Sequence, residues 1–162
     1  MEICREGDAL CVSDLDPFLA ELLRQIPSST KPENISGAEA RLYCRPSEEE
    51  EICAEWKNYV EPELRRLFRS ATETVAADLA QLNGKEKSLR NRTLRIPFEH
   101  ADAWLNALNQ ARLVIAAKHE FTEEELNDHD RSPIGSRRDL SLFQVNFYGF
   151  LQEFILREMM SG

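Results

Sequence analysis

The last part of the chain, residues 139–160, constrains the fold most, because it combines helical spacing with four of the eight phenylalanines. Projected at about 100° per residue, one set of its apolar side chains falls on a single helical face: Leu140, Phe143, Phe147, Phe150, Leu151 and Phe154. A second, narrower set lies roughly opposite: Leu142, Val145, Gly149 and Leu156. The pattern predicts a long helix that packs against other elements on two sides. The element on the second side could belong to the same chain or to the other copy in a homodimer.

Two further amphipathic helices are predicted. One begins at Pro17, directly after Asp16, because aspartate is a favoured N-cap residue and proline is tolerated at the first helical position. The other spans about residues 99–120, and its apolar face is formed by Trp104, Leu108, Ala111 and Ile115. Both helices are expected to pack against the C-terminal one.

Residues 48–82 form the fourth main helical stretch. Ser47 and Glu50 match a capping box, in which the serine accepts from a first-turn N–H and the glutamate reaches back. Pro62 interrupts the stretch, so we expect a kink or a split there, since proline removes one backbone hydrogen bond and clashes with the preceding turn.

The N-terminus is predicted to form a β-hairpin. Residues 2–5 and 9–13 are short strand-like pieces on either side of Gly7, which can adopt positive φ in the turn. A two-stranded hairpin alone is marginal in water, so residues 93–96 are expected to supply a third strand. The predicted fold is therefore mainly α, a bundle of about four main helices with a small two- or three-stranded antiparallel sheet, in a single domain of residues 1–162.

Charge excludes some classes of partner. The chain has 20 Lys and Arg against 29 Asp and Glu, a formal net charge of −9. Nucleic acid and anionic membrane surfaces are bound by predominantly basic surfaces, so neither is an expected partner. No apolar run approaches the roughly 20 residues of a membrane span, and the first residues have no signal-peptide pattern. We therefore expect a cytoplasmic protein that binds another protein.

The cysteines and histidines do not form a recognisable site. The four cysteines lack the C-x-x-C spacing of zinc or redox sites, and a reducing compartment argues against disulfides. In a hairpin, however, Cys4 and Cys11 face each other, so their pairing on oxidation stays open. The three histidines, His100, His119 and His129, have no metal-ligand spacing. We expect no metal, no cofactor and no catalytic residue.

Two groups of polar residues are candidate binding residues. Asn109, Arg112 and Gln152 are expected between the last two long helices, where they would line a polar pocket. The second group is the locally basic stretch of residues 85–95, whose side chains suit an anion or an acidic partner: Lys85, Lys87, Arg90 and Arg92.

Two segments of the chain resemble a known family. The first is a W-L-x-x-L-N-x-x-R-L pattern, and the second is an aromatic-rich final helix with a leucine-glutamine-glutamate element, carried by these residues: Trp104, Leu105, Leu108, Asn109, Arg112 and Leu113, then Leu151, Gln152 and Glu153. They are similar to a bacterial, mainly actinobacterial, family of unknown function that is often encoded beside the ClpS-type protease adaptor. The resemblance implies a cytoplasmic, mostly helical protein with no assigned activity and a link to proteolysis by gene proximity.

These observations lead to one main hypothesis and two alternatives. The main hypothesis is a non-enzymatic interaction or regulatory module. Under this hypothesis the protein is connected to proteolysis, and a homodimer is one of its open arrangements. The alternative is an enzyme or small-ligand-binding protein that uses the pocket of Asn109, Arg112 and Gln152. A third hypothesis is phosphate binding by the basic stretch, which predicts salt-dependent affinity.

Overall fold

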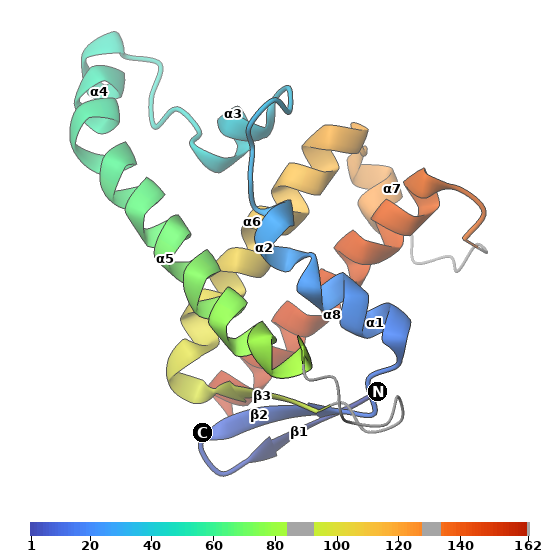
Figure 1. Ribbon diagram of the computed structural model, residues 1–162. Coiled ribbons are helices and arrows are strands. Elements are labelled where there is room, and N and C mark those ends of the chain that lie inside the picture. The colour runs from blue at the N-terminus through green and yellow to red at the C-terminus, as the bar shows by residue number, and fades with distance from the viewer. Residues whose placement is uncertain (84–92, 128–133, 162) are drawn as a thin grey trace.

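The computed structural model describes residues 1–83, 93–127 and 134–161 and is mainly helical, as predicted (Figure 1). The strands are β1 (Glu2–Glu6), β2 (Ala9–Ser13) and β3 (Leu94–Pro97). The α-helices are α1 (Pro17–Arg24), α2 (Ile26–Ser29), α3 (Ala38–Leu42), α4 (Glu50–Glu55), α5 (Glu61–Leu79), α6 (Ala101–His119), α7 (Glu123–Asn127) and α8 (Arg137–Met160). A π-helix, η1 (Trp56–Val60), joins α4 to α5, and two 3₁₀ turns are η2 (Ala80–Asn83) and η3 (Phe98–His100).

The three strands form one antiparallel sheet in the order β1-β2-β3, which confirms the predicted hairpin and third strand. Gly7 takes φ of +62° in the turn, a conformation that a residue with a Cβ rarely adopts. The central strand β2 is almost wholly buried, whereas β1 is mostly exposed. Cys4 and Cys11 are opposite each other in the register, and both are free thiols. Burial raises the pKa of the Cys11 thiol, which makes it less reactive.

The main core lies where the sheet meets α5, α6 and α8. Figure 1 shows the sheet covering one end of these helices, with both chain termini beside it. Trp104 of α6 is fully buried at this junction, and Leu10 of β2 and Leu94 of β3 are buried in the same cluster. α6 is the central helix, because it packs against α2, α3, α5 and α8.

The predicted buried face of α8 is wrong in part. Phe143 and Phe150 were expected in the core, yet both are exposed, Phe150 to 49%. The face that is buried lies between the two predicted stripes and consists of Gln144, Tyr148, Leu151 and Ile155, with Val145 and Phe147 beside it. Leu156 of the second predicted stripe is also exposed. A polar network explains this rotation of the helix.

The network joins α8 to α1. Tyr148 Oη donates to the backbone carbonyl of Leu22 at 2.6 Å and accepts from Gln144 Nε2 at 2.7 Å. Gln144 Nε2 also lies 3.3 Å from Gln25 Oε1. Buried polar groups require such partners, and a helical hydropathy pattern counts glutamine and tyrosine against burial. The network therefore selects a face of α8 that apolar spacing alone does not.

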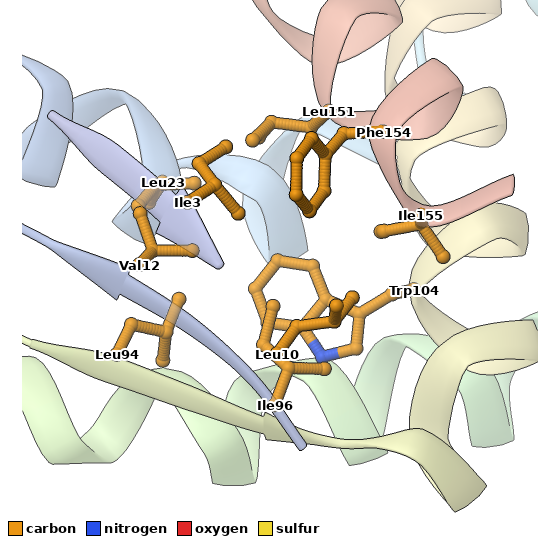
Figure 2. A pocket seen from close by; sticks show the side chains of 10 residues that line it. All are labelled: Ile3, Leu10, Val12, Leu23, Leu94, Ile96, Trp104, Leu151, Phe154 and Ile155. Carbon is orange, nitrogen blue, oxygen red and sulfur yellow. The ribbon is translucent and has the colours of Figure 1, made fainter. Parts of the chain in front are cut away.

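A small apolar cavity lies beneath the sheet (Figure 2). It is lined by side chains of all three strands together with Leu23, Trp104 and three residues of α8, which are Leu151, Phe154 and Ile155. Its volume is about 10 Å³, which is close to what one water molecule occupies, and its apolar lining offers no hydrogen bonds to hold one. The cavity is therefore a packing space and not a ligand site.

None of the described helices is both long and apolar enough to span a membrane.

We predict that Tyr148→Phe destabilises the protein by about 1–3 kcal/mol at neutral pH, because the Leu22 carbonyl loses one of its two donors and buried Gln144 loses an acceptor. Burial also raises the pKa of Tyr148 to about 12, whereas an unfolded tyrosine titrates near about 10. The wild-type chain therefore loses roughly 2–3 kcal/mol of stability as the pH rises from about 10 to about 12.

Urea unfolding followed by circular dichroism at several pH values measures both effects. Because Tyr148→Phe has no phenol to ionise at this position, the stability difference between wild type and variant should shrink across that alkaline range. A stability difference that stays constant with pH would contradict the raised pKa of Tyr148 in the folded protein.

Candidate functional site

The polar contact between α6 and α8 contains two of the three residues predicted to form a pocket. Arg112 Nη1 donates to Gln152 Oε1 at 2.6 Å, and Gln152 Nε2 donates to the backbone carbonyl of Leu105 at 3.1 Å. Both side chains are half-buried, whereas Asn109 is exposed although it lies one turn before Arg112 on α6. The structure joins Arg112 to Gln152 and leaves Asn109 on the surface. Ligand binding by these residues stays a prediction.

Gly149 makes room for the Arg112 guanidinium between the two helices. A Cβ added at Gly149 would lie 3.3 Å from Arg112 Cζ, which is tighter than ordinary van der Waals contact. Arg112 Nε is buried and has no hydrogen-bond partner in the described part of the chain, and an unsatisfied buried donor costs on the order of 1–3 kcal/mol. This donor is the feature that favours a bound anion or water. The apolar cavity of Figure 2 is separate, since Arg112 does not line it.

A second polar cluster, between α5 and α6, was not predicted from the sequence. Asp78 is only 7% exposed, and its carboxylate accepts from Trp104 Nε1 at 2.8 Å and lies 3.0 Å from His100 Nδ1. On the other side of the imidazole, Glu99 lies 3.9 Å from Nε2. The residues are 22 and 26 positions apart, so no local motif joins them. The sequence held one signal for this cluster: Asp78 lies on the same helical face as Val75, among apolar residues that are expected to be buried.

The chemistry of this cluster is structural. A carboxylate that orients a histidine is also a feature of general bases. Here, however, the same carboxylate oxygen serves the indole of Trp104, which is fully buried in the core. Within the described residues, no group of three His, Cys, Asp or Glu side chains is arranged to hold a metal ion. The cluster therefore satisfies the tryptophan N–H and ties α5 to α6.

The four predicted anion-binding residues, Lys85, Lys87, Arg90 and Arg92, lie outside the described residues. His129 lies outside them as well. Two neighbouring basic side chains that the structure does describe are paired with acidic ones. Arg95 Nη2 lies 3.0 Å from Asp8, at the hairpin turn. Arg138 Nη2 lies 2.5 Å from Glu125 of α7 and donates to the backbone carbonyl of His119. Burial, with the nearby charges of Lys118 and Arg138, lowers the pKa of His119.

The most unusual surface is a helical projection that we call the arm, residues 50–67. It consists of α4, η1 and the start of α5, and Figure 1 shows α4 standing clear of the sheet and of α8, at the far end of the molecule. α4 and η1 contain no buried residue. Several large apolar side chains are nevertheless exposed on the arm, Tyr59 to 77% and Leu67 to 52%: Ile52, Tyr59, Val60 and Leu67.

Trp56 lies in the π-helix of the arm and is half-buried there. Its indole Nε1 is shielded from solvent and has no hydrogen-bond partner among the described residues. The predicted split at Pro62 takes the form of this π-helix: Pro62 occupies the first turn of α5, and the preceding turn is widened, with the Glu61 N–H bonded to the Trp56 carbonyl. The predicted capping box is wrong, because α4 begins at Glu50 and Ser47 Oγ accepts from the N–H of Glu49, before the helix.

The base of the arm is fixed to the body by α3. Arg65 lies 2.7 Å from both Glu39 and Glu61, and its guanidinium is 3.9 Å from the ring centroid of Tyr43. Hydrogen bonding to Glu39 raises the pKa of Arg65 above its ordinary value. Tyr43 also contacts Phe68 of α5, with 5.8 Å between ring centroids. Beyond this anchor, α4 and η1 contact mainly each other and α5.

A second exposed apolar surface, the aromatic patch, lies where α1 meets α8. It consists of Phe18, Phe143 and Phe150. The rings of Phe18 and Phe143 have centroids 5.6 Å apart, and Phe143 is 6.4 Å from the mostly buried Phe147. Through Phe147 the patch is in direct contact with the core, whereas the arm projects from it.

Comparison with known proteins places the chain in a family. A family model described as a domain of unknown function (DUF2017) matches residues 3–159. The chain belongs to the DUF2017 family. No curated protein and no solved structure matches it. The resemblance to a family of unknown function is thus confirmed, and the DUF2017 match includes the arm, the aromatic patch and both polar clusters.

We predict that the Arg112–Gln152 contact stabilises the DUF2017 fold. Arg112→Met and Gln152→Leu should each destabilise by about 1–3 kcal/mol, because each leaves a buried polar partner unsatisfied. The double variant should lose less than the sum, with a coupling of about 0.5–3 kcal/mol in urea unfolding. The exposed Asn109→Ala, as a control, should stay within about 0.5 kcal/mol of wild type. Strict additivity would rule out the coupling.

We also predict that Asp78→Ala destabilises by about 1–3 kcal/mol, because the buried Trp104 N–H loses its acceptor. Asp78→Asn keeps an acceptor oxygen and should lose less. Thermal unfolding monitored by tryptophan fluorescence compares the two variants. Equal losses in Asp78→Ala and Asp78→Asn would show that the charge, and not the hydrogen bond to the indole, is what the core requires.

Proposed function

We propose that this protein is a non-enzymatic interaction or regulatory module that binds another protein through the arm. The observation that carries the proposal is the arm itself, in which α4 and η1 expose aromatic and aliphatic side chains and bury none. Contiguous exposed apolar side chains on a folded domain mark interaction sites. Tryptophan and tyrosine, both present in the arm, are the residues that most often dominate the energy of protein interfaces.

The energetics of an isolated helix support this proposal. A helix of this length without tertiary contacts is marginal in water, since most helical stability in proteins comes from packing an apolar face. The free arm is stabilised by ion pairs at its base and by Cys53 Sγ, which lies 3.1 Å from the Ser47 carbonyl. A partner that covers its apolar face would supply the missing packing.

The proposal also covers the organism, the cellular compartment and the oligomeric state. We infer a bacterial, and mainly actinobacterial, cytoplasmic protein that acts in proteolysis or its regulation, because the family resemblance has this association. The net charge of −9 supports a protein partner over nucleic acid or a membrane surface. The aromatic patch is the surface that best suits a homodimer, because it is apolar and packs directly on the core.

The second candidate function, an enzyme or small-ligand-binding protein, rests on the unpartnered Nε of Arg112 between α6 and α8. The other groups of that contact already bind one another, since Gln152 uses its oxygen on Arg112 and its nitrogen on Leu105. The arm therefore supports the interaction module more strongly.

We predict that the arm is the partner-binding surface in the cell. A photo-cross-linking amino acid at position 59, where the tyrosine is 77% exposed, should give a discrete adduct in the native bacterium, whereas the same group at the exposed position 73 on α5 should not. Adding Ile52→Ser and Leu67→Ser should remove the adduct while changing stability by less than about 0.5 kcal/mol, since both residues are exposed.

Phe150→Ser in the aromatic patch is the matched control and should leave the adduct from position 59 intact. Loss of the adduct in the Phe150→Ser variant alone, or equal adducts from positions 59 and 73, would contradict an interaction through the arm. Mass spectrometry of the adduct would identify the partner and test its connection to proteolysis.

A further inference from the structure

The apolar side chains of the arm lie on one continuous helical face. They follow each other at steps of four, four, four and three: Ile52, Trp56, Val60, Leu64 and Leu67. Steps of four overshoot one α-helical turn, so in a regular α-helix such a row drifts around the surface. The π-helix at Trp56–Val60 has more residues per turn and offsets this drift. The π-helix, a feature that occurs frequently at functional sites, therefore keeps the row straight.

The same row continues into the core. Four residues beyond Leu67 is the buried Ala71, and four further is the fully buried Val75, both on the face of α5 that packs on α6. The exposed part from Ile52 to Leu67 is about 22 Å long at 1.5 Å per residue. It is thus the continuation of a helix-packing face that has a helical neighbour from Ala71 onward and, among the described elements, none between Ile52 and Leu67. A face of this kind and length fits one further helix of about four turns.

The charges beside this face select the kind of helix. Residues 47–63 contain seven glutamates and one lysine, whereas the two arginines of the arm, Arg65 and Arg66, lie at its base and are paired with glutamates. Glu51 and Glu55 are one turn apart beside the apolar row, and neither forms a salt bridge in the part of the chain that the structure describes. Glu50, Glu61 and Glu63, by contrast, are paired with arginines.

We propose that the arm binds a basic amphipathic helix of another protein, with the partner's apolar residues on Ile52, Trp56, Val60 and Leu67 and its Lys or Arg residues opposite Glu51 and Glu55. This inference rests on the proposed function and specifies the partner's chemistry. Complementary charge gives specificity and fast association. A second copy of this chain would place acidic residues against acidic residues along the tip of the arm, so like-charge repulsion disfavours it.

Trp56 is the anchor of this interface. Its shielded N–H has no acceptor among the residues that the structure describes, so a rotamer that carries the N–H to an acceptor on the partner becomes favourable when the arm is covered. Large aromatic anchors of this type contribute most of the affinity in helix-in-groove complexes.

The test uses the full-length protein and three synthetic peptides of about 21 residues, labelled with fluorescein and measured by anisotropy. The first carries leucine at helical a and d spacing and lysine elsewhere. The second replaces each lysine with glutamate, and the third has the composition of the first in an order without helical periodicity. We expect the first peptide to bind at least tenfold more tightly than either of the others, and less tightly as salt is raised.

Variants of the protein assign this binding to the arm. Glu51→Lys with Glu55→Lys should weaken binding of the basic peptide at least tenfold, and so should Ile52→Ser with Leu67→Ser. Phe150→Ser should leave it unchanged. Quenching or a shift of tryptophan emission should accompany binding in wild type and disappear in Trp56→Phe, because Trp104 is fully buried.

Several results would overturn the proposal: no binding of the basic peptide, equal binding of the acidic or aperiodic peptide, or binding unaffected by the arm variants. If sedimentation shows that the wild-type protein is a dimer and that Ile52→Ser with Leu67→Ser makes it a monomer, the partner on this face is a second copy of the chain and not a basic helix. If the cellular adduct from position 59 forms while the basic peptide fails to bind, the interaction module stands and only the basic partner is refuted.

Discussion

The structure depends on satisfying one buried hydrogen-bond donor, the indole N–H of Trp104. The ring fills the junction of the sheet, α5, α6 and α8, where water cannot reach the nitrogen. Asp78 supplies the acceptor, and His100 lies against the same carboxylate. Because a buried carboxylate without partners is unfavourable, Asp78 and Trp104 need each other, and the half-buried His100 gives the carboxylate a second partner. This mutual requirement fixes the separation and rotation of α5 relative to α6.

A second polar network fixes α8 in the same way. Tyr148 and Gln144 direct one face of the helix toward α1, and this rotation brings Arg112 and Gln152 together across the interface with α6. Gly149 is where the guanidinium approaches the α8 backbone. The consequence appears at the edge of this contact with α1, where Phe143 and Phe150 are left exposed to solvent. The aromatic patch is thus a result of how the polar core is satisfied.

The arm begins where packing against the body ends. Up to Phe68, α5 is held by Tyr43 and by the ion pairs of Arg65, and from Ala71 onward it is buried against α6. The part beyond the anchor keeps the apolar row of a packing helix but has no neighbour in the described structure. An interface, more than a catalytic site, is the kind of function for which a domain retains such a surface.

Local chemistry determined much of this protein from sequence alone. Asp16 caps α1 and Gly7 takes the positive φ of the hairpin turn, as predicted, because each feature is determined within four residues. Thr122 and Glu125 likewise form a local, reciprocal capping box at α7. The positions of the long helices also followed from periodicity, and the third strand followed from the marginal stability of a two-stranded hairpin. Only the tertiary structure decided which face of α8 is buried and which carboxylate accepts from Trp104. It also decided that the apolar row is exposed from Ile52 to Leu67 and buried from Ala71 onward. These features depend on groups far apart in the chain, and hydropathy does not record the hydrogen bonds that make burial of a polar side chain favourable.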